Sequence, residues 1–90
     1  MNNARRKQIA SIRARLEALQ AQAEEIKSDL ETVRDEEQDA FDNMPESLQD
    51  GERGEKAQAA IDALDEADSG FCGLNDAFDE IYTALEQAAE

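Results

Sequence analysis

The first 42 residues carry apolar side chains at alternating steps of three and four, with no Pro or Gly among them. This spacing places the apolar side chains on one side of an α-helix and is typical of helices that pack lengthwise on a partner. It predicts one helix over about residues 3–42, capped by Asn2 or Asn3 and on the order of 60 Å long. The stripe consists of Ile9, Ile12, Leu16, Leu19, Ala23, Ile26, Leu30 and Val33.

A second apolar stripe follows Pro45, the only Pro of the chain. Pro45 disfavours helical geometry at the preceding residue, and Asn43 tolerates the left-handed conformation that ends many helices. The first helix is therefore expected to stop here, with a turn over residues 43–54 and a second helix over about residues 55–89. The second stripe consists of Ala57, Ala60, Ile61, Leu64, Ala67, Phe71, Leu74, Phe78, Ile81, Tyr82, Leu85 and Ala88.

Two helices of similar length joined by a short connection are expected to fold back on each other. The predicted fold is all-α, a long antiparallel helical hairpin that forms one domain. A turn near Ser47 would set Phe71 opposite Ala23 and Phe78 near Leu16, so that large side chains face small ones.

Gly70 and Gly73 fall inside the second predicted helix. Each costs about 1 kcal/mol relative to Ala, which makes a kink conceivable. The apolar stripe keeps its phase across both, so we expect one continuous helix. The two glycines and Cys72 either mark a close approach of a second hairpin or are tolerated as solvent-facing residues.

A chain of 90 residues with few aromatic side chains can build only a thin core. A single hairpin would leave Ile12, Leu19 and Tyr82 partly exposed, and pairing two hairpins would cover them. We therefore expect residues 1–90 to form a homodimeric four-helix bundle or coiled coil. The expected core and oligomer seam consists of Ile9, Ile12, Leu16, Leu19, Ile26, Leu30, Val33, Ile61, Leu64, Phe71, Leu74, Phe78, Ile81 and Leu85.

Charge is distributed unevenly along the chain. Residues 1–20 hold five basic side chains and one acidic one, whereas the other 70 residues hold four basic and 22 acidic ones, for a net charge of −14. Such a surface repels nucleic acid and anionic membranes and attracts proteins that hold nucleic acid. Acidic helix surfaces are also commonly only solubilising, and both interpretations stay open.

The basic N-terminal segment does not predict direct binding of nucleic acid, because no aromatic residue is interleaved for base stacking. In the hairpin it would be neutralised by the facing helix instead. The expected neighbours are Glu86 and Glu90 for Arg5, Arg6 and Lys7, and Asp76, Asp79 and Glu80 for Arg13 and Arg15.

No pattern in the sequence predicts a reaction. The chain has no His, a lone Cys72 and no glycine-rich phosphate loop between a strand and a helix. The carboxylates from Asp35 to Asn43 lack the central Gly and terminal Glu of an EF-hand loop. We expect no catalytic residue, metal site or cofactor. Since no targeting segment or membrane-spanning run is present, we expect a cytoplasmic protein.

The segment around the turn is a candidate site for a partner protein, because it combines an apolar centre with an acidic rim. The alternative is purely structural, with Phe41 and Leu48 packed over the start of the second helix near Ile61. The candidate partner-binding residues are Asp35, Glu36, Glu37, Asp39, Phe41, Asp42, Met44, Glu46 and Leu48.

This segment also resembles a known group of proteins. Residues 34–49 read RDEEQDAFDNMPESLQ and are followed by GERGE at 51–55 and AIDALDEA at 60–67, while residues 3–7 read NARRK. The strings are similar to those of a group of short acidic proteins encoded by bacteriophages and prophages. The resemblance covers most of the chain and implies a phage or prophage context with a non-catalytic accessory role.

Three functions are compatible with these features. The favoured one is an interaction protein, an acidic mimic of nucleic acid that inhibits a host defence or nucleic-acid-binding protein. The second is an oligomeric sponge for a nucleotide signal, which needs basic side chains that converge, with Arg5, Arg6, Arg34 and Arg53 as candidates. The third is a structural or assembly role as a coiled coil, marked by self-association without a host partner.

Overall fold

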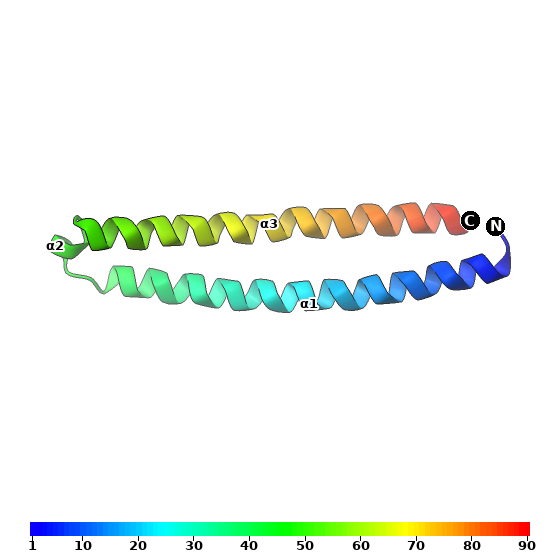
Figure 1. Ribbon diagram of the computed structural model, residues 1–90, viewed down its shortest axis with the longest axis horizontal. Helices are drawn as coiled ribbons and strands as arrows, with labels where there is room; N and C mark the ends of the chain where they lie inside the picture. The colour runs from blue at the N-terminus through cyan, green and yellow to red at the C-terminus, as the bar shows by residue number, and fades with distance from the viewer.

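The computed structural model describes residues 1–90 and shows an extended hairpin of two long helices (Figure 1). Helix α1 (Asn3–Asp42) leads through the short helix α2 (Glu46–Gln49) into α3 (Glu52–Ala89), and no strand is present. The two chain ends lie together at one end of a rod of 69 × 16 × 12 Å. The prediction of an all-α, extended chain is confirmed.

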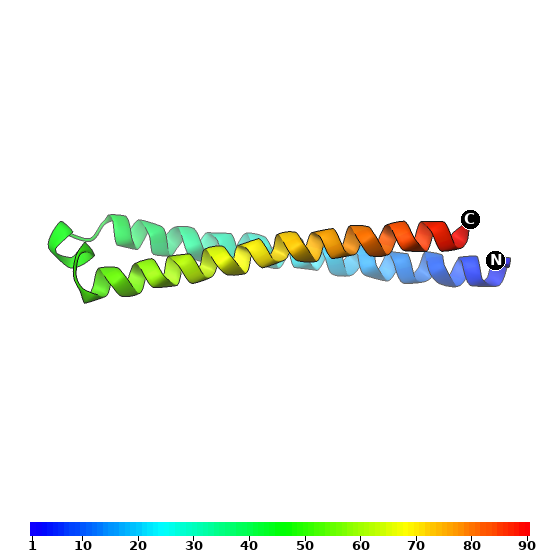
Figure 2. The ribbon, with the colours of Figure 1, turned by 90° about the horizontal axis from the view of Figure 1, so that it is seen from above.

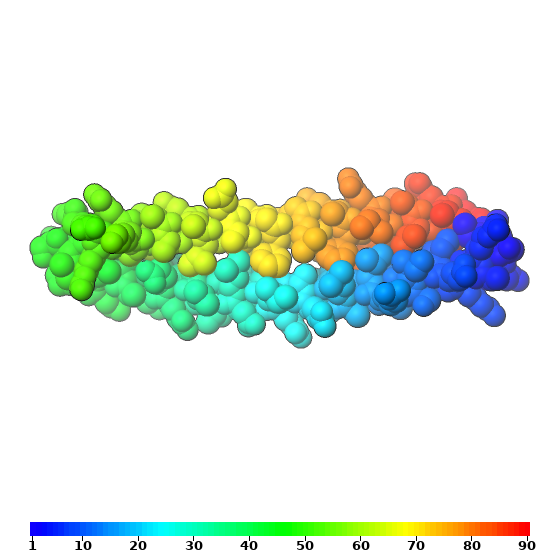
Figure 3. Space-filling model, in the orientation of Figure 1, coloured from blue at the N-terminus to red at the C-terminus, as the bar shows by residue number.

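The two long helices wind gently around each other, so that they cross near the middle of the rod when seen from above (Figure 2). The space-filling view shows them in contact along the whole rod (Figure 3). Helix α1 begins at an Asn2 cap, whose side chain accepts a hydrogen bond from the backbone N–H of Arg5 at 2.8 Å. The cap satisfies one of the amide groups that a helix start leaves free.

The turn differs in detail from the sequence prediction. Asn43 ends α1 with φ −86°, in the right-handed region, and no residue of the chain has positive φ. The expected left-handed cap is therefore wrong. Besides backbone hydrogen bonds to Asp39 and Phe41, the end of α1 and the turn are held by the side chain of Gln49, whose Nε2 donates to the carbonyl oxygens of Phe41 and Met44 at 3.0 and 3.1 Å.

Helix α3 starts at Glu52, close to the expected start near residue 55, and its first turn packs against α2. An added Cβ at Gly54 would lie 1.8 Å from the carbonyl oxygen of Gln49, so only glycine allows this approach. Farther along, α3 runs without a break through Gly70 and Gly73, where an added Cβ would meet no atom within 4 Å.

The buried core is small and concentrated toward the turn. Gly54, Ala57, Ile61 and Phe78 are the four buried residues, and Ile61, with 1% of its surface exposed, is the most enclosed of them. Three of the four lie within the first ten residues of α3. The rest of the interface between α1 and α3 is half-buried, as expected for two helices that touch along one side only.

Candidate functional site

The facing sides of α1 and α3 form what we call the inner seam. Its apolar members on α1 recur every seven residues. Those on α3 occupy two heptad positions that lie four residues apart. They are buried or half-buried, and they are Ile9, Leu16, Ala23 and Leu30 on α1, and Ala57, Ile61, Leu64, Phe71, Phe78, Tyr82 and Leu85 on α3.

Polar residues on α1 share the inner seam, each four positions after an apolar member: Arg13, Gln20, Lys27 and Arg34. All four contact polar groups of α3, and we call them the polar ladder. The guanidinium of Arg13 lies 2.9 Å from Glu86, and that of Arg34 lies 2.8 Å from Asp65. These two ion pairs join the helices near opposite ends of the rod.

The middle of the ladder combines an amide and an ammonium group. Gln20 donates to Oδ1 of Asn75 at 2.7 Å and accepts from the hydroxyl of Tyr82 at 2.9 Å. The ammonium of Lys27 lies 3.3 Å from Oδ1 of Asp68. Because each group bonds to a fixed position of α3, the ladder specifies the antiparallel register as well as adding contacts.

Electrostatics within the ladder favours the charged form of its cations. The pKa of Arg13 is raised by hydrogen bonds to Glu86 and Glu17, and the pKa of Arg34 by its hydrogen bond to Asp65. The pKa of Lys27 is raised by its hydrogen bond to Glu31 on the same helix, with a smaller contribution from Asp68. The three cations are therefore bound to carboxylates rather than free to hold a ligand.

The basic N-terminal segment is partly neutralised by α3, although the partners of Arg13 differ from those expected. Arg6 donates to the backbone carbonyl oxygens of Ala89 and Glu90 at the end of α3. Arg13 pairs with Glu86 instead of Asp76, Asp79 or Glu80, and its guanidinium lies 4.9 Å from the centre of the Tyr82 ring.

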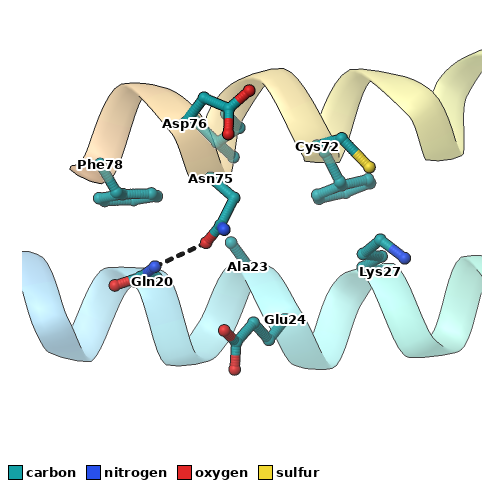
Figure 4. A pocket seen from close by; sticks show the side chains of 10 residues that line it. Gln20, Ala23, Glu24, Lys27, Cys72, Asn75, Asp76 and Phe78 are labelled. Atoms are coloured by element: carbon teal, nitrogen blue, oxygen red, sulfur yellow. Dashed lines mark hydrogen bonds between the residues drawn. The ribbon is translucent and has the colours of Figure 1, made fainter. Parts of the chain in front are cut away.

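A cavity of about 390 Å³ opens between the helices near the middle of the rod (Figure 4). Ala23 on α1 and Phe71 on α3 both line it, so the small side chain leaves space beside the large one. Gln20, Lys27 and Asn75 lie at its edge and are bonded to one another or to neighbouring carboxylates. No group of three or more side chains is arranged to hold a metal ion.

Six of the predicted seam residues lie outside the inner seam. They form what we call the outer stripe, with 43% to 57% of each residue's surface exposed. The α1 members are seven residues apart, and so are the α3 members. The outer stripe consists of Ile12, Leu19, Ile26 and Val33 on α1, and Leu74 and Ile81 on α3.

The candidate partner-binding segment has two kinds of side chain. Phe41, Met44 and Glu37 are half-buried, whereas Leu48 is 40% exposed. The remaining acidic residues are exposed and project from the end of α1 and from α2: Asp35, Glu36, Asp39, Asp42 and Glu46. The turn thus presents carboxylates and one apolar side chain, while Phe41 and Met44 face inward.

The candidate arginines of a nucleotide sponge do not meet within one hairpin. Arg5 and Arg6 lie at the open end of the rod, Arg53 lies beside the turn, and Arg34 is bound to Asp65. The sequence reasoning placed Arg13 beside carboxylates of the facing helix but missed the other members of the polar ladder. A signal for it was available, since Arg13, Gln20, Lys27 and Arg34 recur every seven residues.

The fold and these surfaces define the chain as an extended helical hairpin with an acidic exterior and an uncovered apolar stripe. Comparison with protein-family models, with curated proteins and with solved structures gives no match. None of the helices combines the length and apolar character needed to cross a membrane.

Proposed function

We propose that the chain is a non-catalytic interaction protein of the bacterial cytoplasm, encoded by a phage or prophage, that acts as a homodimer. Its acidic surface binds a basic, nucleic-acid-binding host protein in place of nucleic acid, as an inhibitor of host defence would. The observation that carries the proposal is the density of exposed carboxylates along the half of the rod that contains the turn.

That density is close to the charge density of nucleic acid. Residues 21–72, which make up the turn half of the rod, hold 17 acidic and four basic side chains. Spread over half of the 69 Å length, this is about one net negative charge per 2.7 Å, between the values of about 1.7 Å for duplex DNA and 3.4 Å for one strand.

The other half of the rod provides an internal contrast. Residues 1–20 and 73–90 hold five basic and six acidic side chains, so this half is nearly neutral. A surface that only solubilised the protein would have no need for such an asymmetry. The concentration of charge at one end favours a directed electrostatic contact with a basic partner.

The proposal is tested by capturing partners from bacterial lysate at low and high salt and identifying them by mass spectrometry. The expected partner handles nucleic acid, is released as salt increases, and is displaced by added nucleic acid of defined length. A partner that stays bound at high salt and in the presence of nucleic acid would contradict the mimicry.

Two matched variants locate the contact. The first neutralises three exposed, unpaired carboxylates near the turn, in Glu36→Gln/Asp39→Asn/Glu46→Gln. The second removes the same number of charges in the open half of the rod, in Asp76→Asn/Asp79→Asn/Glu80→Gln. We expect the first to weaken binding at least about tenfold and the second far less, since charged contacts act over about a Debye length. Equal losses would show a non-specific polyanion.

A further inference from the structure

The outer stripe forms a single face of the hairpin. In both helices each of its members follows an inner-seam residue by three positions, as Ile12 follows Ile9 and Leu74 follows Phe71. In two antiparallel helices, positions with the same offset from the contact line turn to the same side of the pair. The exposed residues of α1 and α3 therefore lie together on one side of the rod.

The α3 part of this face contains no charged side chain. On α3 the outer stripe continues through small side chains, and all of the positions on this side of the helix are exposed. Small side chains at this spacing let a second helix approach closely, and an added Cβ at Gly70 would meet no atom of this hairpin. The positions are Ala60, Ala63, Ala67, Gly70, Leu74, Ala77, Ile81, Ala84 and Ala88.

The rod as a whole exposes more surface than a compact monomer of its mass, by an area similar to one side of a standard protein interface. The chain exposes 6532 Å², whereas a typical monomer of 10.0 kDa exposes about 5,200 Å². The excess of about 1,300 Å² compares with the roughly 800 Å² that each partner contributes to a standard protein interface.

We infer that this face is covered by a second copy of the chain, packed antiparallel so that the two turns lie at opposite ends of a four-helix bundle. The inference builds on the homodimer proposed above and specifies its interface. In this arrangement α1 packs on α1 of the second copy, and α3 packs on α3.

The symmetry of the face supports a twofold axis through its centre. On α1 the outer stripe is centred between Leu19 and Ile26. The neighbouring ladder contacts join Gln20 to Asn75 and Lys27 to Asp68, so this centre lies opposite residues 68–75 of α3. That stretch contains Leu74, the middle of the α3 positions. Both halves of the face thus have their centres at one level, as an isologous dimer requires.

Charge selects the antiparallel arrangement over the parallel one. Parallel hairpins would bring the two turn halves together, each with 17 acidic and four basic side chains. Antiparallel hairpins place each turn half beside the nearly neutral open half of the other copy. Since the two acidic turn halves would repel each other in the parallel dimer, the antiparallel dimer has the lower electrostatic cost.

One specific pair of charges crosses this interface. Arg15 borders the outer stripe between Ile12 and Leu19, and it forms no ion pair within the hairpin. Asp29 borders the stripe between Ile26 and Val33 and is likewise unpaired. The twofold rotation that relates the two copies brings Arg15 of one copy beside Asp29 of the other. The two opposite charges then attract each other across the interface.

The inference is tested by measuring mass and orientation together. Sedimentation equilibrium should give twice the chain mass of 10.0 kDa. For orientation, spin labels are attached at Ser47→Cys in a Cys72→Ser background, and their separation is measured by electron spin resonance. Antiparallel packing places the two labels close to the 69 Å length of the rod apart, whereas parallel packing brings them together at one end.

Substitutions identify the face. Leu19→Glu should raise the dimer dissociation constant by at least about 100-fold, because it buries a charge in the interface. Ala21→Glu, at an exposed position outside the stripe, is the matched control and should change it little. Arg15→Asp should weaken the dimer about fivefold or more, and adding Asp29→Arg should restore it.

The outcomes distinguish a failure of the homodimer from a failure of the interface inferred for it. A wild-type chain that stays monomeric at high concentration would contradict the homodimer and the interface together. A dimer with a short label separation would leave the homodimer in place and overturn the antiparallel arrangement. A dimer that tolerates Leu19→Glu as well as Ala21→Glu would overturn the assignment of this face. None of these results depends on binding of a host protein.

Discussion

The turn end and the middle of α3 are packed in different ways. Beside the turn, Gly54 allows α2 to touch α3 at backbone distance, and Ala57 and Ile61 are buried. In the middle of the rod, Gly70 and Gly73 face open space, and Ala23 and Phe71 both line a cavity. The hairpin therefore buries its own side chains mainly near the turn and leaves the middle of α3 exposed.

The largest expected effect is at Ile61, which is 1% exposed. Ile61→Ala should lower the free energy of unfolding by about 2–5 kcal/mol, because it removes three buried carbons and leaves a cavity. Urea unfolding followed by circular dichroism measures this.

Ile26→Ala is the matched control, since Ile26 is 57% exposed. Measured at a concentration where the chain is monomeric, it should stay within about 0.5 kcal/mol of wild type. Equal costs for the two substitutions would contradict the difference between the turn and the middle of the rod.

The second effect is at Gly54, where no side chain fits. Gly54→Ala would place a Cβ 1.8 Å from the carbonyl oxygen of Gln49, so α2 has to move away from α3. We expect a loss of about 1–3 kcal/mol, together with faster amide hydrogen exchange at residues 46–51. Unchanged stability and exchange would show that α2 does not pack tightly.

Part of this architecture could be predicted from the sequence. The 3-4 spacing predicted long helices, and Pro45 marked the region of the turn, because both signals act through local geometry. The spacing could not separate Ile9 and Leu16 from Ile12 and Leu19, since all four belong to the same apolar pattern. Only the partner helix decides which of them is covered.

The candidate site was predicted less completely, for a related reason. Carboxylates near the turn are visible in the sequence, but the inward position of Phe41 and Met44 exists only after the chain has turned, where Gln49 also bonds their backbone carbonyls. Of the polar ladder only Arg13 was expected to pair with the facing helix, and with other carboxylates than Glu86. Lys27 and Arg34 were missed because they look like ordinary surface charges until α3 lies beside them.

The third effect has the opposite sign from Gly54→Ala. Gly73→Ala places a methyl group in open space and removes the conformational freedom of a glycine inside a helix. We expect a gain of about 1 kcal/mol in the free energy of unfolding, measured by the same urea titration. A loss would mean that the middle of α3 is already covered at Gly73 by another copy, which would place the contact on a different face.

The smallest effect is a dependence on alkaline pH. The pKa of Lys27 is raised by its hydrogen bond to Glu31, and the pKa of Tyr82 is raised by burial. In both cases the folded chain holds its proton more tightly than the unfolded chain. This contribution to stability is therefore fully present below about pH 10 and is lost as the pH rises through the folded pKa values.

Urea titrations between pH 8 and pH 11.5 should show this decrease, and two conservative variants assign it. Lys27→Arg keeps a cation opposite Asp68 that does not titrate in this range, and Tyr82→Phe removes the phenol. We expect the double variant to show a shallower decrease than wild type. An equal decrease in both proteins would mean that the loss of stability comes from repulsion among the carboxylates. The net charge of −14 becomes more negative as the remaining lysines lose their protons. The middle of the ladder would then hold the helices by packing more than by charge.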